Sequence, residues 1–397
     1  TSIRTTFALP AAPAPGIYVF AGLSFIESIA RALVVTIMAL QSYELLGSAQ
    51  GVGTLSVFVG LFSFGAGLAV PLIIRKLSRR WTYTLGALSL IIAAALLLAF
   101  TVPAQIAGVC IRGFGTACLN ITANLYFMDY IGRHRLVRAD AMRMVGATTG
   151  WTAGPWLGVY LAETYAPAVT YTASAVFAAV LILVFWYLRL KDRTVILPAG
   201  RAPDDPRRSI AGFLAQPRLR LAWIIAFGRS AYWTTLFTYG PILLLVAGLS
   251  REAGGVLVSL ANATLLTAVL WAFLAERRGV RPATTLCFVG MGATTMLAGM
   301  YGSAEPLAAA AFLLAASVFA SGLDAFGSVP FYRAVKPRQR AAMSGVYRSY
   351  MDFGDLLPNL VYVALLGFFG IGSVFLALGL FHLAIAILAW RFLPRSM

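Results

Sequence analysis

The chain is poor in the residues from which most enzyme sites are built. Its 397 residues include two histidines, three cysteines and 14 acidic residues. Cys110, Cys118 and Cys287 lie in apolar stretches without C-x-x-C spacing, so we interpret them as core residues rather than as a metal or redox site. A His-Glu-x-x-His motif, a nucleophile elbow and a phosphate-binding glycine loop are also absent from the sequence. We therefore predict a protein that is not an enzyme and that holds neither a metal nor a cofactor.

Charged residues are also scarce, whereas apolar residues are abundant. Charged residues make up 11% of the sequence, hydrophobic residues make up 60%, and the mean hydropathy is +0.83. Soluble domains contain roughly 45–50% apolar and about 25% charged residues. Because a soluble fold of this length could not bury so much apolar surface, we predict an integral membrane protein surrounded by a lipid bilayer.

The net charge of +17 raises the alternative of a nucleic-acid-binding protein. Such proteins gather basic residues on one polar, exposed face. Here the lysines and arginines instead interrupt long apolar runs at intervals. Short basic loops between apolar spans are what the positive-inside rule produces, so no nucleic-acid partner is expected.

Apolar runs of about 20 residues, the length that crosses a bilayer, occur in two groups of six. The first group is expected at 17–40, 51–74, 82–101, 104–128, 141–162 and 168–189. The second group is expected at 220–247, 253–275, 283–301, 306–330, 342–367 and 372–391. The predicted fold class is therefore all-α integral membrane, with twelve transmembrane helices in two six-helix halves.

A polar segment with several prolines separates the two groups. We divide the chain into an N-terminal tail (1–16), an N-terminal half (17–190), a linker (191–219) and a C-terminal half (220–397). The linker and every second loop are basic, whereas the opposite loops hold almost no basic residue except Arg251. This asymmetry predicts that both termini are cytoplasmic, in what we expect to be a bacterial inner membrane.

The two halves have similar sequence features at an offset of 201–204 residues. Phe25–Ser28 aligns with Phe227–Ser230, the basic turn at Arg75 aligns with the turn at Glu276, and Phe127 aligns with Phe331. Repeated halves are typical of transporter folds. We therefore expect the two six-helix halves to be related by a pseudo-two-fold axis.

Three local motifs give the whole chain a resemblance to the major facilitator superfamily. The segment 272–281, with Glu276 and Arg277, is similar to the G-x-L-a-D-r-x-G-r-r signature of that family. The segment from Arg112 to Ala117 resembles a shortened R-x-x-q-G motif. The segment 150–158 resembles the G-x-x-x-G-P-x-x-G motif of the drug/proton antiporters. We assign gating and helix bending to Gly150, Gly154, Pro155, Gly158, Glu276 and Arg277.

A first set of ionisable residues is spread over four of the expected spans, where each residue costs at least about 2.5–3.5 kcal/mol and is therefore expected to be functional. Span 17–40 carries Glu27 and Arg31 on one face, because they are four residues apart. The other spans carry Arg112, Arg229 and Asp324. The family resemblance implies that these four spans line a central cavity.

These residues define the candidate substrate site. We expect the following residues to contact substrate or to act as counter-ions: Arg31, Arg112, Asn124, Arg229, Tyr232 and Asp324. Repeat symmetry would bring Glu27 and Arg229 to matching heights on facing helices, so we also expect an attraction between these two residues. A self-contained Glu27–Arg31 pair without a transport role is the structural alternative.

A second set of charges lies on the span 342–367. Arg348, Asp352, Asp355 and Asn359 recur at spacings of four, three and four, which gives one polar stripe on a helix. Two carboxylates three residues apart repel each other when both are ionised, so one should bind a proton more readily. We expect proton coupling at Glu27, Asp352 or Asp355. Alternatively, Arg348 and Asp352 anchor the helix near the membrane surface.

The sequence thus predicts a secondary active transporter that works by alternating access. We favour proton-coupled efflux of a small organic molecule by a monomer, with the substrate and protons as its partners. Two alternatives stay open: an importer or facilitator of an organic anion or vitamin-like nutrient, and a non-transporting membrane receptor.

Overall fold

A computed structural model describes residues 16–131, 136–188, 206–302, 304–335 and 340–394, and every regular element in these ranges is a helix. Most of the predicted tail and linker lies outside the described residues. The N-terminal half contains α1 (Ile17–Ala32), α2 (Val35–Leu46), α3 (Ala49–Leu97), α4 (Val102–Tyr130), α5 (Leu136–Thr164) and α6 (Pro167–Tyr187).

The described part of the predicted linker contains α7 (Pro206–Leu214) and the start of α8 (Pro217–Val246), which is the first span of the C-terminal half. This half continues with α9 (Arg251–Ala263), the 3-10 helix η2 (Thr264–Thr267), α10 (Ala268–Arg278), α11 (Val280–Tyr301), α12 (Pro306–Phe326), α13 (Val329–Ala334), α14 (Arg340–Arg348), α15 (Tyr350–Leu366) and α16 (Gly372–Phe392).

These helices account for all twelve predicted spans, although several spans are interrupted. One span is divided into α1 and α2, another into α9, η2 and α10, and a third into α14 and α15. The long α3 contains two spans, because its backbone turns at Ser78, which has a φ of 68°. Among the described residues, eight helical segments are long and apolar enough to cross a membrane by themselves. The predicted all-helical membrane fold is confirmed.

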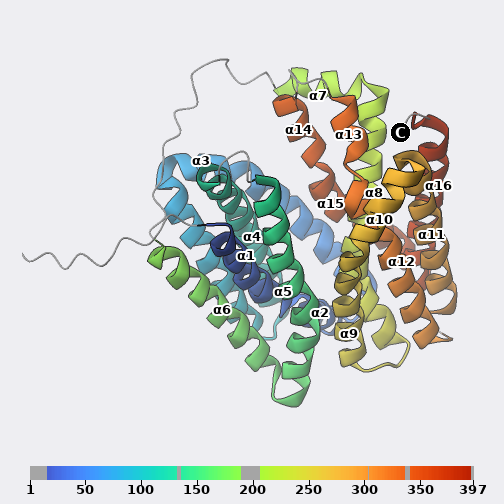
Figure 1. The fold of residues 1–397 in the computed structure, drawn as a ribbon. Coiled ribbons are helices and arrows are strands. Elements are labelled where there is room, and N and C mark those ends of the chain that lie inside the picture. The colour runs from blue at the N-terminus through green and yellow to red at the C-terminus, as the bar shows by residue number, and fades with distance from the viewer. Residues whose placement is uncertain (1–15, 132–135, 189–205, 303, 336–339, 395–397) are drawn as a thin grey trace, which may run out of the picture.

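The helices form two bundles that lie side by side (Figure 1). Helices α1 to α6 form one bundle, and the helices from α8 onward form the other. Each has its own buried core: Tyr83, Tyr126 and Phe185 pack together in the first, and Tyr232, Phe288 and Phe375 belong to the core of the second.

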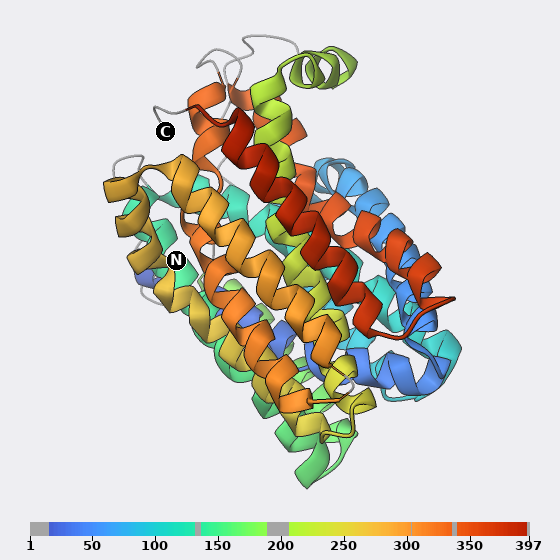
Figure 2. The same ribbon diagram turned by 90° about the vertical axis from the view of Figure 1, so that its right-hand side faces the viewer.

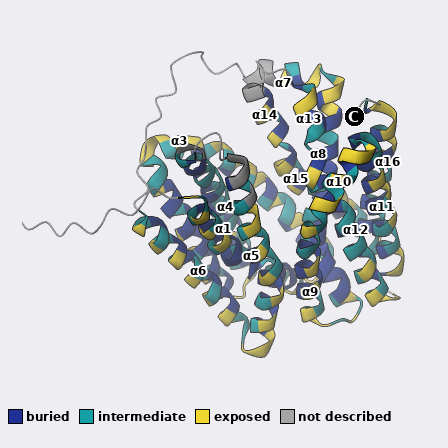
Figure 3. Ribbon diagram, viewed as in Figure 1, coloured by how far each residue is buried: buried dark blue, intermediate teal, exposed yellow. Residues whose placement is uncertain are grey.

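Exposed residues follow the outward faces of both bundles (Figure 3). Many of them are large and apolar, including Leu68, Val269 and Leu183. Helices satisfy their backbone hydrogen bonds internally, so their apolar outer faces can meet lipid without an unpaired polar group. The bundles are therefore integral to the membrane.

Contacts between the two halves gather at one end of the molecule. We call the end that carries α7, the turn of α3 at Arg75–Arg80 and the junction of α10 with α11 at Arg277–Arg281 the basic side, and the other end the opposite side. The main contacts join α5 to α9, α3 to α15 and α2 to α8, and they lie toward the opposite side. Toward the basic side the two bundles diverge (Figure 1).

Candidate functional site

The break between α1 and α2 lies in the middle of the first span, at Leu33 and Val34. A helix end leaves carbonyl groups without partners, and lipid cannot supply any. Here side chains from two other helices supply them: Ser174 donates to the Ala30 carbonyl oxygen at 2.6 Å, and Arg112 donates to the Arg31 carbonyl oxygen at 2.8 Å. The break is therefore stabilised by tertiary contacts.

Glycines of α5 pack directly against this break. A Cβ atom on Gly158 would lie 1.8 Å from the Leu33 carbonyl oxygen, and one on Gly154 would lie 2.4 Å from the Ala32 Cβ. Larger side chains would push α5 away from α1. The glycine motif thus permits the close contact between helices that its small residues suggested, and the neighbour is α1.

Pro155 follows in the same helix, where the chain meets the other half. A proline has no N–H and bends a helix, so the hydrogen-bond ladder loosens beside it. The N–H of Trp156 donates to Ser259 Oγ of α9 at 2.9 Å. This hydrogen bond links the main chain of one half to a side chain of the other.

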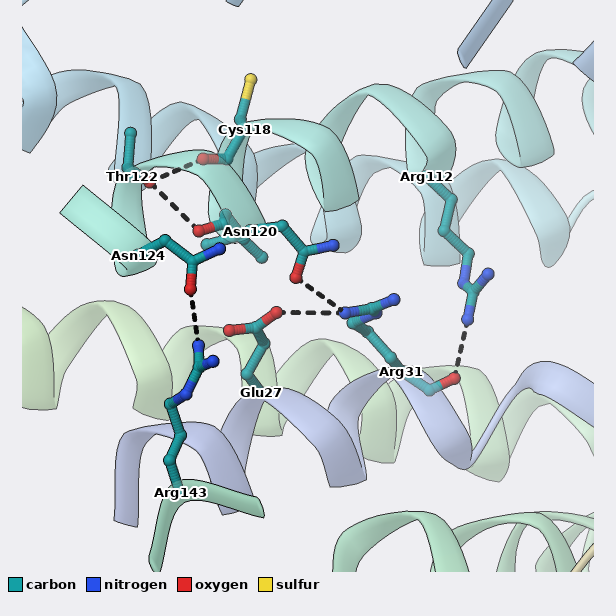
Figure 4. A network of polar contacts seen from close by, with 9 residues as sticks. Glu27, Arg31, Arg112, Cys118, Asn120, Thr122, Asn124 and Arg143 are labelled. Carbon is teal, nitrogen blue, oxygen red and sulfur yellow. Dashed lines mark hydrogen bonds and ion pairs between the residues drawn. The ribbon is translucent and has the colours of Figure 1, made fainter. Parts of the chain in front are cut away.

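A polar network occupies the space between α1, α4 and α5 (Figure 4). Glu27 and Arg31 form an ion pair at 3.1 Å, and Arg31 also donates to Asn120 at 3.5 Å. Arg143 donates to Asn124 at 2.7 Å and forms an ion pair with Asp140 at 2.9 Å. Glu27 is 8% exposed, so its charge is balanced inside the protein.

The second ion pair of the interior lies wholly within the C-terminal half. Arg229 of α8 pairs with Asp324 of α12, which also accepts a hydrogen bond from Trp233 at 2.9 Å. Arg229 donates in addition to the Tyr350 hydroxyl at 2.9 Å. The expected attraction between Glu27 and Arg229 is therefore wrong for this conformation, because each residue pairs with a closer partner in its own half.

Tyr232 lies in a different place from the one expected. It is buried between α8 and α12, and its hydroxyl donates to the Leu313 carbonyl oxygen at 2.7 Å and lies 2.8 Å from Ser317 Oγ. One helical turn separates it from Arg229, but its side chain faces the core of the C-terminal half. In this conformation Tyr232 packs the half together rather than facing the other half.

The polar stripe of α15 runs along the face between α3 and α8. Leu356 and Phe353 contact α3, whereas Asp355 accepts a hydrogen bond from Thr234 of α8 at 2.5 Å. Asn359 is buried and accepts a hydrogen bond from Tyr239 at 2.8 Å. Asp352, by contrast, is exposed. The stripe is thus enclosed toward the opposite side and open toward the basic side.

The carboxylates of this stripe differ from the other acids in the interior. Asp352 and Asp355 are both exposed, and neither belongs to an ion pair within the part of the chain that the structure describes. The proposed Arg348–Asp352 pair is therefore not formed. Asp355 is a carboxylate that faces the space between the halves with a hydroxyl as its partner.

Glu276 and Arg277 lie at the basic end of α10, and both are exposed. The Arg277 guanidinium lies 4.0 Å from the centre of the Phe273 ring. Their expected gating role rests on the motif alone, because in this conformation the other half contacts α9 rather than the end of α10.

The opposite side holds a charged contact that the sequence did not suggest. Arg251, at the start of α9, forms ion pairs with Glu44 of α2 and with Glu163 of α5, the latter at 3.4 Å. Both carboxylates belong to the N-terminal half. The scarcity of basic residues in the opposite loops was the available signal, since it singled out Arg251.

Arg143 was also missed, although it interrupts an apolar span at its third residue. Arg143 and Asn124 are far apart along the chain, so the sequence alone did not show that the arrangement of α4 and α5 brings their side chains together. A half-buried arginine close to a span boundary resembles an ordinary loop residue in sequence.

Comparisons with known proteins agree with this architecture. Residues 20–265 match the family described as the Major Facilitator Superfamily, whereas no curated protein sequence matches the chain. A solved nucleoside transporter, NupG, is similar with a TM-score of 0.72 at 15% identity, over 94% of this chain and 98% of that chain.

Two further solved structures have the same fold. A POT family transporter in complex with 5-aminolevulinic acid has a TM-score of 0.78 at 12% identity, over 97% of this chain and 99% of that chain. A D-xylose-proton symporter has a TM-score of 0.75 at 13% identity, over 96% and 98%. The family match spans more than half of the chain, and this chain belongs to the Major Facilitator Superfamily.

Proposed function

We propose that this secondary transporter exports a small amphipathic organic molecule in exchange for protons. Asp355 is the observation that carries the proposal. Its carboxylate is exposed on the face between the halves, it accepts a hydrogen bond from Thr234, and it has no cationic partner among the described residues. Such a carboxylate can take up and release a proton without breaking an ion pair.

The arrangement of the halves supports alternating access. If the basic side is cytoplasmic, as the positive-inside rule predicts, the halves are closed toward the outside and apart toward the cytoplasm. Asp355 then meets the cytoplasm, where it releases its proton and substrate binds. After the halves reverse, substrate leaves to the outside and the carboxylate takes up one external proton.

Antiport requires that proton and substrate do not occupy the site together. A substrate that contacts the Asp355 carboxylate competes with its proton, so binding of one favours release of the other. An apolar surface lies at a depth similar to that of Asp355. It consists of the Trp151 and Phe237 rings, which stack across the halves at a centroid distance of 5.6 Å, and of Trp233 beside them. An amphipathic molecule fits this combination of carboxylate and aromatic rings.

The alternative of organic-anion uptake requires cationic groups that are free to bind the substrate. Arg31, Arg143 and Arg229 each have a carboxylate partner in their own half. Arg112 donates to a main-chain carbonyl oxygen. Because an anion would have to displace these partners, the pairing favours proton antiport.

The first prediction concerns Asp355→Asn. A thermal-shift screen of amphipathic compounds supplies a ligand, because ligand binding raises the unfolding temperature. Proteoliposomes are loaded with that ligand and a pH-sensitive dye. With an inward proton gradient, the wild type should release ligand and acidify its interior, whereas Asp355→Asn should lose the acidification and retain ligand exchange.

Glu305→Gln is the matched control, since Glu305 is an exposed carboxylate in the loop before α12. It should behave as the wild type does. Ligand movement in the wild type without linked proton movement would refute antiport, and normal acidification in Asp355→Asn would exclude Asp355 as the proton site.

A further inference from the structure

Helix α7 is a short amphipathic helix on the basic side, attached to the C-terminal half. Its sequence is PRRSIAGFL. Phe213 is 2% exposed, whereas Ile210 and Leu214 are 48% and 56% exposed. One face of α7 is therefore packed against the protein, and a second apolar face is not.

The packed face fixes the position of the helix. Phe213 belongs to a buried cluster with Leu219, Met343, Tyr347 and Tyr350. Gln216, in the short connection to α8, donates to the Gly212 carbonyl oxygen at 3.1 Å. In both ribbon views α7 lies across the end of α8, and Figure 2 shows it projecting to one side of that end.

The unpacked face points to lipid. Ile210 and Leu214 are four residues apart, so they lie on the same side of α7, while Ala211 is exposed on another side. A helix that crosses the end of a membrane span lies in the plane of the bilayer surface. At that depth an apolar face can enter the boundary between headgroups and acyl chains.

The charges beside α7 select the kind of lipid. Arg218 and Arg220 at the start of α8 are both exposed, and the sequence of α7 adds Arg207 and Arg208. Basic residues near a bilayer attract anionic headgroups, by about 1 kcal/mol each. This end of the C-terminal half thus combines an apolar helix face with positive charge.

We propose that α7 is an interfacial helix that binds the anionic-lipid surface of the bilayer, with Ile210 and Leu214 inserted and the neighbouring arginines at the headgroups. The same cluster that holds α7 contains Tyr350, whose hydroxyl accepts a hydrogen bond from Arg229. The helix that would bind lipid is therefore packed into the same cluster as a hydrogen-bond partner of the interior ion pair.

The test uses the full chain in vesicles of phosphatidylcholine, with and without phosphatidylglycerol. Ile210→Cys, Leu214→Cys and the matched control Ala211→Cys are labelled with an environment-sensitive dye, because the three native cysteines are buried. Positions 210 and 214 should show blue-shifted emission and quenching by brominated lipid, whereas position 211 should be quenched by aqueous iodide. The blue shift should grow with phosphatidylglycerol and shrink in Arg218→Gln/Arg220→Gln.

Two results would overturn the proposal. Equal iodide quenching at all three positions would place α7 in water, where a soluble protein or a second copy would be its partner. Lipid quenching that does not depend on phosphatidylglycerol would show that α7 has no preference for anionic lipid. Because these readouts require no transport, they are independent of the proposed antiport.

Discussion

Individual charged residues in the interior fall into two kinds. Glu27 and Arg31 are a partly buried pair whose charges depend on each other. Asp355 has a hydroxyl partner and faces the space between the halves. Removing one member of a buried pair leaves an uncompensated charge, whereas neutralising a carboxylate without a cation does not.

The second prediction follows from this difference. Glu27→Gln should lower stability by about 3–5 kcal/mol, the typical cost of breaking a buried pair. Asp355→Asn should leave stability close to that of the wild type. Thermal unfolding in detergent, followed by tryptophan fluorescence, measures both.

The double variant Glu27→Gln/Arg31→Met is the control, because it removes both charges together. It should be more stable than Glu27→Gln. If the losses of stability in Glu27→Gln and Arg31→Met add up to the loss in the double variant, the two charges are not coupled. The destabilisation by Glu27→Gln would then need another cause.

Residue by residue, the sequence predicted the charged interior better than it predicted the partners. The i, i+4 spacing was sufficient for Glu27 and Arg31, because a helix fixes that distance. The pairing of Arg229 with Asp324 was not predictable in the same way, since it depends on how α8 and α12 pack. Repeat symmetry indicated that Glu27 and Arg229 lie at matching depths, but it did not give the distance between them. It therefore led to the wrong expectation that these two residues attract each other.

At the scale of helices, α5 is distinctive because it makes close contacts both within its own half and with the other half. Its glycines bring it against the break between α1 and α2, and its proline directs a main-chain N–H toward α9. The same helix therefore joins the interrupted span of its own half to the other half. Changes in α5 should consequently affect both packing within the half and contact between the halves.

The third prediction tests the packing of α5. Gly158→Ala would place a Cβ 1.8 Å from the Leu33 carbonyl oxygen, so the backbone must shift. Overpacking of this kind typically costs about 1–3 kcal/mol. Thermal unfolding should show the loss.

Gly67→Ala is the matched control, because a Cβ at Gly67 of α3 meets nothing within 4 Å. It should be neutral or slightly stabilising, since alanine favours a helix over glycine. Equal stability of the two variants would mean that α1 and α5 separate easily.

Spans were predictable at this scale because apolar length is a local property of sequence. Their interruptions were not. The break in the first span is stabilised by Ser174 and Arg112, which are distant in the chain. At Ser78, by contrast, the backbone leaves the helical conformation close to where the sequence predicted the boundary between two spans.

For the whole molecule, the decisive feature is that the two halves meet on the opposite side. Arg251 with Glu44 and Glu163, the Trp156–Ser259 hydrogen bond and the contacts of α3 with α15 all lie there. Alternating access requires these contacts to break when the halves reverse. The stability of this set therefore determines how much of the protein is open on the basic side.

The fourth prediction concerns Arg251→Ala. Exposed ion pairs typically contribute at most about 1 kcal/mol, which corresponds to roughly a fivefold shift in a two-state population. The variant should move the population toward the state that is open on the opposite side. Distances between spin labels at the C-terminal end of α2 and the N-terminal end of α9 would measure this population. Added salt should weaken the ion pairs of the wild type and shift its population toward the same state.

Glu252→Gln is the control, because Glu252 is the exposed neighbour of Arg251 and lies outside both ion pairs. Its distance distribution should match that of the wild type. An unchanged distribution in Arg251→Ala would show that the charges are not what holds the halves together.

The hydrogen bond between Trp156 and Ser259 has a consequence for mutational mapping of the closed interface. The donor is a main-chain N–H, which every residue except proline possesses. Replacing the indole side chain therefore leaves the contact intact, and a side-chain scan of α5 would assign position 156 no part in it. The dependence is visible only from the partner helix, where loss of the Ser259 hydroxyl removes the hydrogen bond between the halves.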